Sequence, residues 1–168
     1  MRFFLAFGSN LGDRLAHLRF ARSEALQSIA LGSLEVAGLY ESDPVDCPSG
    51  STPFLNTVVG GMTSLSPQEI LVSTQSIESR AGRSRSTVRN APRCLDVDIL
   101  LLDDLILRTE NLTIPHPRLH LRRFVLQPLA ELAPDLIIPG MTASVSSLCA
   151  SREAEGGESA PVRLSSCW

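Results

Sequence analysis

Apolar positions along the chain switch between the two-residue repeat of strands and the wider repeat of helices. The repeat predicts strands at 2–7, 34–41, 54–63 and 93–102, and helices from Asp13 to near Gly32 and from Pro67 to about Ala81. The resulting order is β-α-β-β-α-β. This order is typical of an α+β, ferredoxin-like fold, in which helices pack on an antiparallel sheet.

Turn and capping residues support these boundaries. Asp13 follows a glycine-rich turn and is expected to cap the first helix. Ser66-Pro67-Gln68-Glu69 predicts a capping box at the second helix, and Gly82 is expected to end it. Prolines and Gly50 mark a loop over 42–53. The Gly60-Gly61 pair predicts a bulge in the third strand.

The chain after the sixth element is less regular. Leu112-Thr-Ile114 and Pro115-His116-Pro117 follow, and a further helix is expected from about Arg122 to Leu132. Small and polar residues dominate from Ala150 onward, which predicts a flexible C-terminal tail. The predicted organisation is therefore one domain over 1–149, followed by a tail over 150–168.

Composition narrows the class of protein. A chain of 168 residues with 43% hydrophobic residues can bury a core, and its net charge of -3 argues against nucleic-acid binding. The apolar runs are too short to cross a membrane, and the N-terminus is interpreted as a strand rather than a signal peptide. The four cysteines are Cys47, Cys94, Cys149 and Cys167. Their scattered positions match no zinc motif and predict a cytoplasmic protein with reduced thiols.

All 15 lysine-plus-arginine positions in this sequence are arginine. The absence of lysine excludes a Walker A lysine and a Schiff-base lysine. Any phosphate group must therefore be bound by guanidinium groups, which suit bidentate contacts to phosphate oxygens.

The most informative chemical signal is Asp96 and Asp98 in an otherwise apolar strand. Side chains two residues apart on a strand share one face, about 6.6 Å apart along it. Buried carboxylates need a cation, which can be a metal ion or an arginine. The pair is therefore a candidate magnesium site, with an ion pair to Arg93 and an exposed edge strand as the alternatives.

Four segments, in order, resemble one known family. They are Gly8-Ser-Asn-Leu-Gly-Asp13, Phe54-Leu-Asn56, Pro92-Arg-Cys-Leu-Asp-Val-Asp-Ile-Leu100, and Leu112-Thr-Ile-Pro-His-Pro-Arg118 with Arg122-Arg-Phe124. Together they resemble the 6-hydroxymethyl-7,8-dihydropterin pyrophosphokinases of folate biosynthesis. The resemblance implies transfer of pyrophosphate from ATP to the pterin hydroxymethyl group, with release of AMP.

The resemblance also implies roles for individual residues. Asp96 and Asp98 would bind two Mg²⁺ ions, and Arg83 and Arg93 would contact the phosphates as catalytic groups. The residues expected at the nucleotide are Gln75, Glu78, Arg85, Arg89, Thr113, His116 and Arg122. The residues expected at the pterin are Ser42, Pro44, Val45, Phe54, Asn56 and Phe124. Without the resemblance, each phenylalanine would be interpreted as core and His116 as structural.

Two further expectations follow from the same resemblance. Asn90-Ala91 replaces the aromatic-glycine pair that usually precedes Pro92, which changes how an arginine loop over 83–93 would close. The chain is expected to act as a monomer on small molecules, with neither nucleic acid nor membrane as a partner. The alternative function is a non-catalytic ferredoxin-like module that binds a pterin or a nucleotide.

Overall fold

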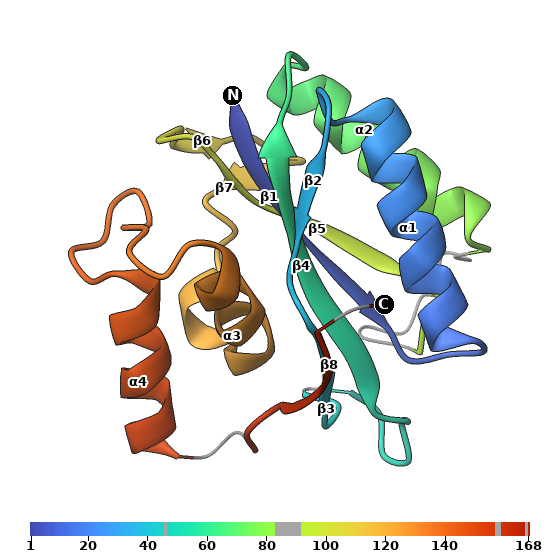
Figure 1. Ribbon diagram of the computed structural model, residues 1–168, viewed down its shortest axis with the longest axis vertical. Helices are drawn as coiled ribbons and strands as arrows, with labels where there is room; N and C mark the ends of the chain where they lie inside the picture. Colours follow the sequence, from blue (N-terminus) through green and yellow to red (C-terminus); the bar gives the residue numbers. More distant parts are fainter. Residues whose placement is uncertain (46, 83–91, 157–158, 167) are drawn as a thin grey trace.

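The computed structural model describes residues 1–45, 47–82, 92–156, 159–166 and 168 (Figure 1). The strands are β1 (Arg2–Ser9), β2 (Leu34–Val36), β3 (Leu39–Ser42), β4 (Phe54–Met62), β5 (Asp96–Leu102), β6 (Leu107–Arg108), β7 (Thr113–Ile114) and β8 (Val162–Ser165). The helices are α1 (Arg14–Ser28), α2 (Pro67–Arg80), the short 3-10 helix η1 (Leu119–Leu121), α3 (Arg123–Leu132) and α4 (Val145–Glu155).

Within the described residues, six strands form one antiparallel sheet. The order is β5-β1-β4-β3-β8, and β2 also pairs with β4. The central part, β1-α1-β2/β3-β4-α2-β5, has the connectivity predicted for a ferredoxin-like fold, so that prediction is confirmed. The single strand expected at 34–41 is divided into β2 and β3 around Ala37 and Gly38.

Helices cover both faces of the sheet (Figure 1). On one face, Leu5 of β1 belongs to the core formed with Leu18 of α1 and Ile70 of α2. On the other face, Phe4 of β1 belongs to a second core with Leu126 of α3. Successive residues of β1 therefore supply two different cores, as strand alternation requires.

The predicted helix starts are confirmed. Asp13 accepts a hydrogen bond from the Ala16 N–H at 3.0 Å and caps α1. Ser66 and Glu69 form the reciprocal capping box at α2. These local signals are correct because each depends only on neighbouring residues.

The predicted bulge at Gly60-Gly61 is wrong. Pairing of β4 with β1 is continuous through both glycines. Their function is close packing: a Cβ on Gly60 would lie 2.8 Å from the Phe4 ring, and one on Gly61 would lie 3.2 Å from the Phe3 ring. The glycines thus leave room for aromatic rings on both faces of the sheet.

The irregularity lies instead in β5. Phe4 and Leu5 of β1 pair with Leu101 and Ile99, so Leu100 is an extra residue without a partner position. As a result Leu100 and Leu101 both belong to the α3 core, although they are consecutive. The Leu100 carbonyl accepts the backbone N–H of His116 at 2.9 Å.

The C-terminal residues differ from the predicted flexible tail. Residues 145–155 form α4, and β8 pairs with β3 at the end of the sheet. These contacts join residues more than a hundred positions apart, so a local composition pattern cannot reveal them. No described helix is long and apolar enough to cross a membrane.

Candidate active site

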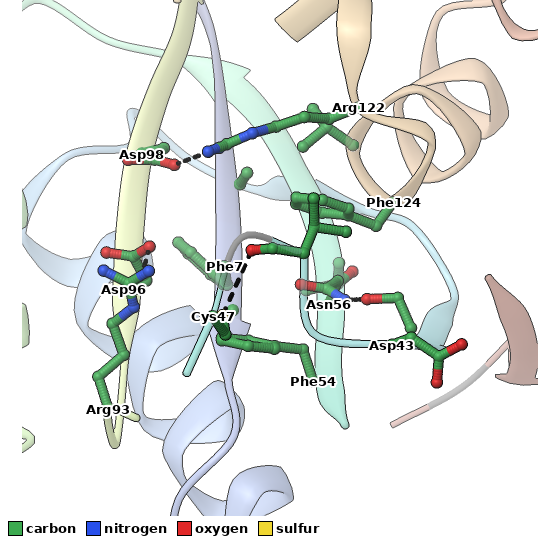
Figure 2. Close-up of a pocket in the computed structure, with 16 residues that line it drawn as sticks. Phe7, Asp43, Cys47, Phe54, Asn56, Arg93, Asp96, Asp98, Arg122 and Phe124 are labelled. Carbon is green, nitrogen blue, oxygen red and sulfur yellow. Dashed lines mark hydrogen bonds and ion pairs between the residues drawn. The ribbon is translucent and has the colours of Figure 1, made fainter. Parts of the chain in front are cut away.

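Asp96 and Asp98 project from β5 toward the α3 face of the sheet (Figure 2). They pair with Gly8 and Ala6 of β1, and all four residues line one pocket. The predicted shared face is therefore confirmed. Gly8 keeps this surface open, since a Cβ there would lie 3.3 Å from Asn56 Oδ1.

Cationic side chains surround both carboxylates. Arg93 Nε lies 3.5 Å from Asp96 Oδ2, and Arg122 Nη1 lies 3.5 Å from Asp98 Oδ2 (Figure 2). His116 Nε2 lies 3.9 Å from the same Asp98 oxygen. The ion pair with Arg93 that was the alternative to a metal site is present. The same arginines also form a surface that can receive a polyanion.

Burial adjusts the charge of this cluster. Burial, followed in effect by the neighbouring cations Arg122 and Arg118, lowers the pKa of His116 to about 4. His116 is therefore neutral at physiological pH. Burial also lowers the pKa of the Arg122 guanidinium, followed in effect by the charge of Arg118.

The residues predicted at the pterin gather in the pocket that contains both aspartates. Its lining includes Ser42, Val45, Phe54, Asn56 and Phe124. Asn56 is 5% exposed, and its Nδ2 donates to Ser42 Oγ at 2.8 Å, which fixes the orientation of the amide. Pro44, the remaining residue expected at the pterin, is partly buried in the loop between β3 and β4 and is not among the residues that line this pocket.

Phe54 and Phe124 lie on either side of Asn56 (Figure 2). Both rings are partly exposed and line the pocket, so neither is a buried core residue. The Arg122 guanidinium lies 5.4 Å from the Phe124 ring centroid, within cation-π range. Two aromatic faces and a fixed amide suit a flat heterocycle with polar edges.

A second pocket adjoins the first. It is lined by Thr113 and His116, two of the residues expected at the nucleotide, and it shares Asp98 with the first pocket. From α2 its lining comprises Leu71 and Thr74. Asp98 thus lies where the two pockets meet.

The two α2 residues predicted at the nucleotide are placed differently from each other. Gln75 is exposed on the helix surface. Glu78 Oε1 accepts the Val97 N–H at 2.8 Å, so its carboxylate binds the backbone of β5 between the two aspartates. Arg83, Arg85 and Arg89, with the Asn90-Ala91 pair, lie outside the described residues.

Sequence reasoning missed Asn10, which is 2% exposed. Its Oδ1 accepts the Arg93 N–H at 2.9 Å, and its own N–H donates to the Arg93 carbonyl at 3.2 Å. Its Nδ2 donates to the Thr52 carbonyl at 3.3 Å, and the Thr52 hydroxyl donates to the Asn10 carbonyl. Asn10 therefore joins the two loops that flank the pocket. Its place in the Gly8-Ser-Asn10 turn was the available signal.

The donor set fits a magnesium ion better than a softer metal. Asp96 and Asp98 offer only oxygen atoms, and their side chains are 21% and 34% exposed. In the described part of the chain, no group of three or more His, Cys, Asp or Glu residues could hold a metal. Magnesium can bind with so few protein ligands, because it is commonly coordinated by one or two carboxylates and completes its coordination shell with phosphate oxygens and water.

Comparison with known proteins agrees with this geometry. The model of the 7,8-dihydro-6-hydroxymethylpterin-pyrophosphokinase (HPPK) family matches residues 4–134. The chain is 46% identical over 129 residues to the 2-amino-4-hydroxy-6-hydroxymethyldihydropteridine pyrophosphokinase of Bacillus subtilis, which covers 77% of this chain and 76% of the relative. It is 38% identical over 138 residues to the protein of that name from Pseudomonas aeruginosa, with 82% and 84% covered.

Larger proteins contain the same unit. The folic acid synthesis protein fol1 of Schizosaccharomyces pombe is 42% identical over 139 residues, but this chain spans 18% of its length. A solved HPPK-DHPS structure in complex with substrates matches the fold with a TM-score of 0.74, at 14% identity, over 92% of this chain and 43% of the other. The family match covers more than half of this chain, and the two bacterial relatives are matched over most of their own length. The chain therefore belongs to the 7,8-dihydro-6-hydroxymethylpterin-pyrophosphokinase family.

Proposed function

We propose that this protein transfers pyrophosphate from ATP to the hydroxymethyl group of 6-hydroxymethyl-7,8-dihydropterin, forming the pterin diphosphate and AMP in folate biosynthesis. The observation that carries the proposal is the position of Asp98, which lines both pockets. An enzyme with two substrates needs adjoining sites, and the reacting atoms must meet at their boundary. Family membership supports the same reaction.

The first pocket is proposed to bind the pterin. Phe54 and Phe124 offer ring faces for stacking, and Asn56 offers an amide to the polar edge of the heterocycle. Because Asn56 Nδ2 is already bound to Ser42, its Oδ1 is the atom best placed to accept from the ligand. These contacts orient the hydroxymethyl group toward the carboxylates.

The second pocket is proposed to bind the nucleotide, with Thr113 and His116 in its wall. Arg93 and Arg122 then face the phosphates from the aspartate side. Attack at the β-phosphorus builds negative charge on the phosphate oxygens, and fixed guanidinium groups stabilise that charge without reorganising. On the basis of the family resemblance, we also propose contacts to the nucleotide from Arg83, Arg85, Arg89, Gln75 and Glu78.

Asp96 and Asp98 would hold magnesium, for which two ions are proposed. When bound, magnesium neutralises phosphate charge and lowers the pKa of the substrate hydroxyl. Without a cation, the negative charge of the two carboxylates would repel the triphosphate. We further propose that the protein is cytoplasmic and monomeric. Sedimentation of the purified protein would test the oligomeric state.

The reaction is tested by the identity of the nucleotide product. A single turnover with ATP, magnesium and 6-hydroxymethyl-7,8-dihydropterin should give AMP and the pterin diphosphate, measured by phosphorus NMR. ADP as the main product would mean transfer of one phosphoryl group instead. Tight pterin binding without any AMP would favour the non-catalytic binding module.

A further inference from the structure

The C-terminal strap, defined as residues 159–166 with Trp168, lies beyond the stretch matched by the family model. Its strand β8 pairs with β3, so that Arg163 lies opposite Tyr40 and Val162 opposite Glu41. Figure 1 shows β8 beside β3 at the end of the sheet. The strap therefore covers a strand that would otherwise be an open edge.

Two polar anchors hold the strap. Arg163 Nε donates to Glu131 Oε1 at 2.6 Å, and Glu131 also accepts from the Tyr40 hydroxyl at 2.7 Å. Trp168 Nε1 donates to the Ala37 carbonyl at 3.0 Å. The Arg22 guanidinium lies 4.8 Å from the Trp168 ring centroid and binds the Trp168 carbonyl. The strap thus contacts β3, α3 and α1.

Gly38 shows how closely the strap approaches. A Cβ at this position would lie 2.7 Å from the Ser165 carbonyl oxygen and 3.0 Å from Arg163 Nε. The first of these is a backbone atom, which cannot move aside without moving the strand. The seating of β8 therefore depends on a glycine at position 38.

The strand covered by the strap leads directly into the pterin side of the site. Ser42, the last residue of β3, accepts the hydrogen bond from Asn56 and pairs with Phe54. Asp43 follows and lines the first pocket. Ser159 Oγ donates to Asp43 Oδ2 at 2.6 Å, so the strap also contacts the pocket lining itself.

We propose that the C-terminal strap positions the pterin side of the active site, with Ser159, Arg163 and Trp168 as positioning residues. The inference rests on the proposed function, since it assumes that the first pocket binds the pterin. It assigns pterin affinity partly to residues that lie outside the matched family region.

The physical reason is the weakness of a short edge strand. Without β8, the four residues of β3 would pair on one side only, and such edges fray. Fraying would release Ser42 and Asp43, and binding the pterin would then require ordering them again. The nucleotide pocket, which is lined from α2, β5 and the 110–117 segment, would not share that cost.

Full-length variants can displace the strap without touching the pocket. Arg163→Glu places a carboxylate against Glu131, and Gly38→Ala introduces the clash with Ser165. Ser159→Ala removes only the contact to Asp43. Ser151→Ala is the matched control, because its hydroxyl bonds within α4 to the Ser147 carbonyl.

Docking of the strap can be monitored directly, because Trp168 is the only tryptophan. Its emission should shift to longer wavelength in the Gly38→Ala/Arg163→Glu double variant as the indole leaves Ala37 and Arg22.

Binding is then compared for the pterin and for a non-hydrolysable ATP analogue. We expect the double variant to weaken pterin binding by about tenfold, and Ser159→Ala by about threefold, because a loop must be ordered on binding. The dissociation constant of the ATP analogue and kcat at saturation should stay within about twofold of wild type. Ser151→Ala should change neither constant.

Three outcomes would overturn the proposal. One is unchanged pterin binding with Trp168 displaced, and another is an equal loss for both ligands. The third is unshifted Trp168 emission in the double variant, because these contacts would then not hold the strap. Failure of the wild-type protein to bind the pterin at all would refute the proposed function instead, and that measurement is made first.

Discussion

The backbone N–H of Arg118 donates a hydrogen bond to Nδ1 of His116 at 3.2 Å. A neutral imidazole carries one proton, so this bond assigns it to Nε2. Nε2 is the atom that faces Asp98 across 3.9 Å. His116 therefore presents a fixed N–H donor, rather than a lone pair, toward the boundary of the two pockets.

The low pKa of His116 predicts an acid-sensitive fold. Above pH 6.5 the imidazole is neutral in both the folded and unfolded chains and has no effect on stability. Between pH 6.5 and 4 the unfolded chain binds a proton that the folded chain excludes, so the free energy of unfolding falls as pH falls. Relative to His116→Gln, wild type should lose on the order of 2 kcal/mol between pH 7 and pH 5.

Urea denaturation in EDTA at the two pH values measures this difference. His116→Gln keeps the other two histidines, so their contributions cancel in the comparison. Parallel pH profiles for wild type and variant would contradict the low pKa.

Replacing Asp96 or Asp98 by asparagine should nearly abolish turnover. Each change removes a charge at the point where phosphate and hydroxyl would meet, and we expect losses of at least about a hundredfold in kcat. Both carboxylates are partly exposed, so the melting temperature should change little. Steady-state kinetics with magnesium as the only divalent metal checks this, and near-normal kcat in both variants would refute the metal-site assignment.

Loss of either aromatic ring should affect the pterin more than the nucleotide. Phe54→Ala and Phe124→Ala each remove a stacking face worth about 1 kcal/mol beyond burial, or roughly a fivefold change in affinity. Phe20→Ala is a close control. Like Phe124, Phe20 has an arginine near its ring, with Arg80 at 5.5 Å, but it lies on the opposite face of the sheet from the pocket.

Calorimetric titration of the three phenylalanine variants with both ligands separates the possibilities. Phe20→Ala should lower stability without changing pterin affinity. If Phe54→Ala and Phe124→Ala weakened both ligands equally and lowered the melting temperature as Phe20→Ala does, these rings would be ordinary packing residues.

Asn10→Ala should impair use of both substrates. It removes the side-chain bonds to Arg93 and Thr52 together and takes the partner from the partly buried Arg93 N–H, at a cost of about 1 kcal/mol in stability. Thr52→Val removes only the hydroxyl bond on the pterin side. We therefore expect higher KM for both substrates in Asn10→Ala and for the pterin alone in Thr52→Val. A change in one substrate only for Asn10→Ala would mean that the residue does not link the loops.

The features of this fold that could be predicted from the sequence depend on residues close together in the chain. The capping box at Ser66 and the shared face of Asp96 and Asp98 depend on spacings of two or three residues. We assigned Phe54, Asn56 and Phe124 only through family resemblance, since their residue types alone do not distinguish them from structural residues. The structure then brought them to one pocket.

The features that sequence reasoning missed depend on distant contacts. Gly60 and Gly61 suggested a bulge, but the rings of Phe3 and Phe4 explain them. The polar tail suggested mobility, but Glu131 and Ala37 bind it. Neither partner can be identified from the local sequence, because nothing in the composition of a segment states which residues it will meet.

The extra residue at Leu100 makes β5 one position longer than the stretch of β1 that it accompanies. Deleting Leu100 would leave Asp98 opposite Ala6 and give a regular strand pairing. It would also remove the Leu100 carbonyl that accepts the hydrogen bond from the His116 backbone N–H. A shorter β5 would therefore give a more regular sheet but would no longer position His116, and we expect lower activity. The length of β5 thus sets the position of a candidate active-site residue, so the effect of an insertion or deletion in β5 should be measured by catalysis rather than by folding.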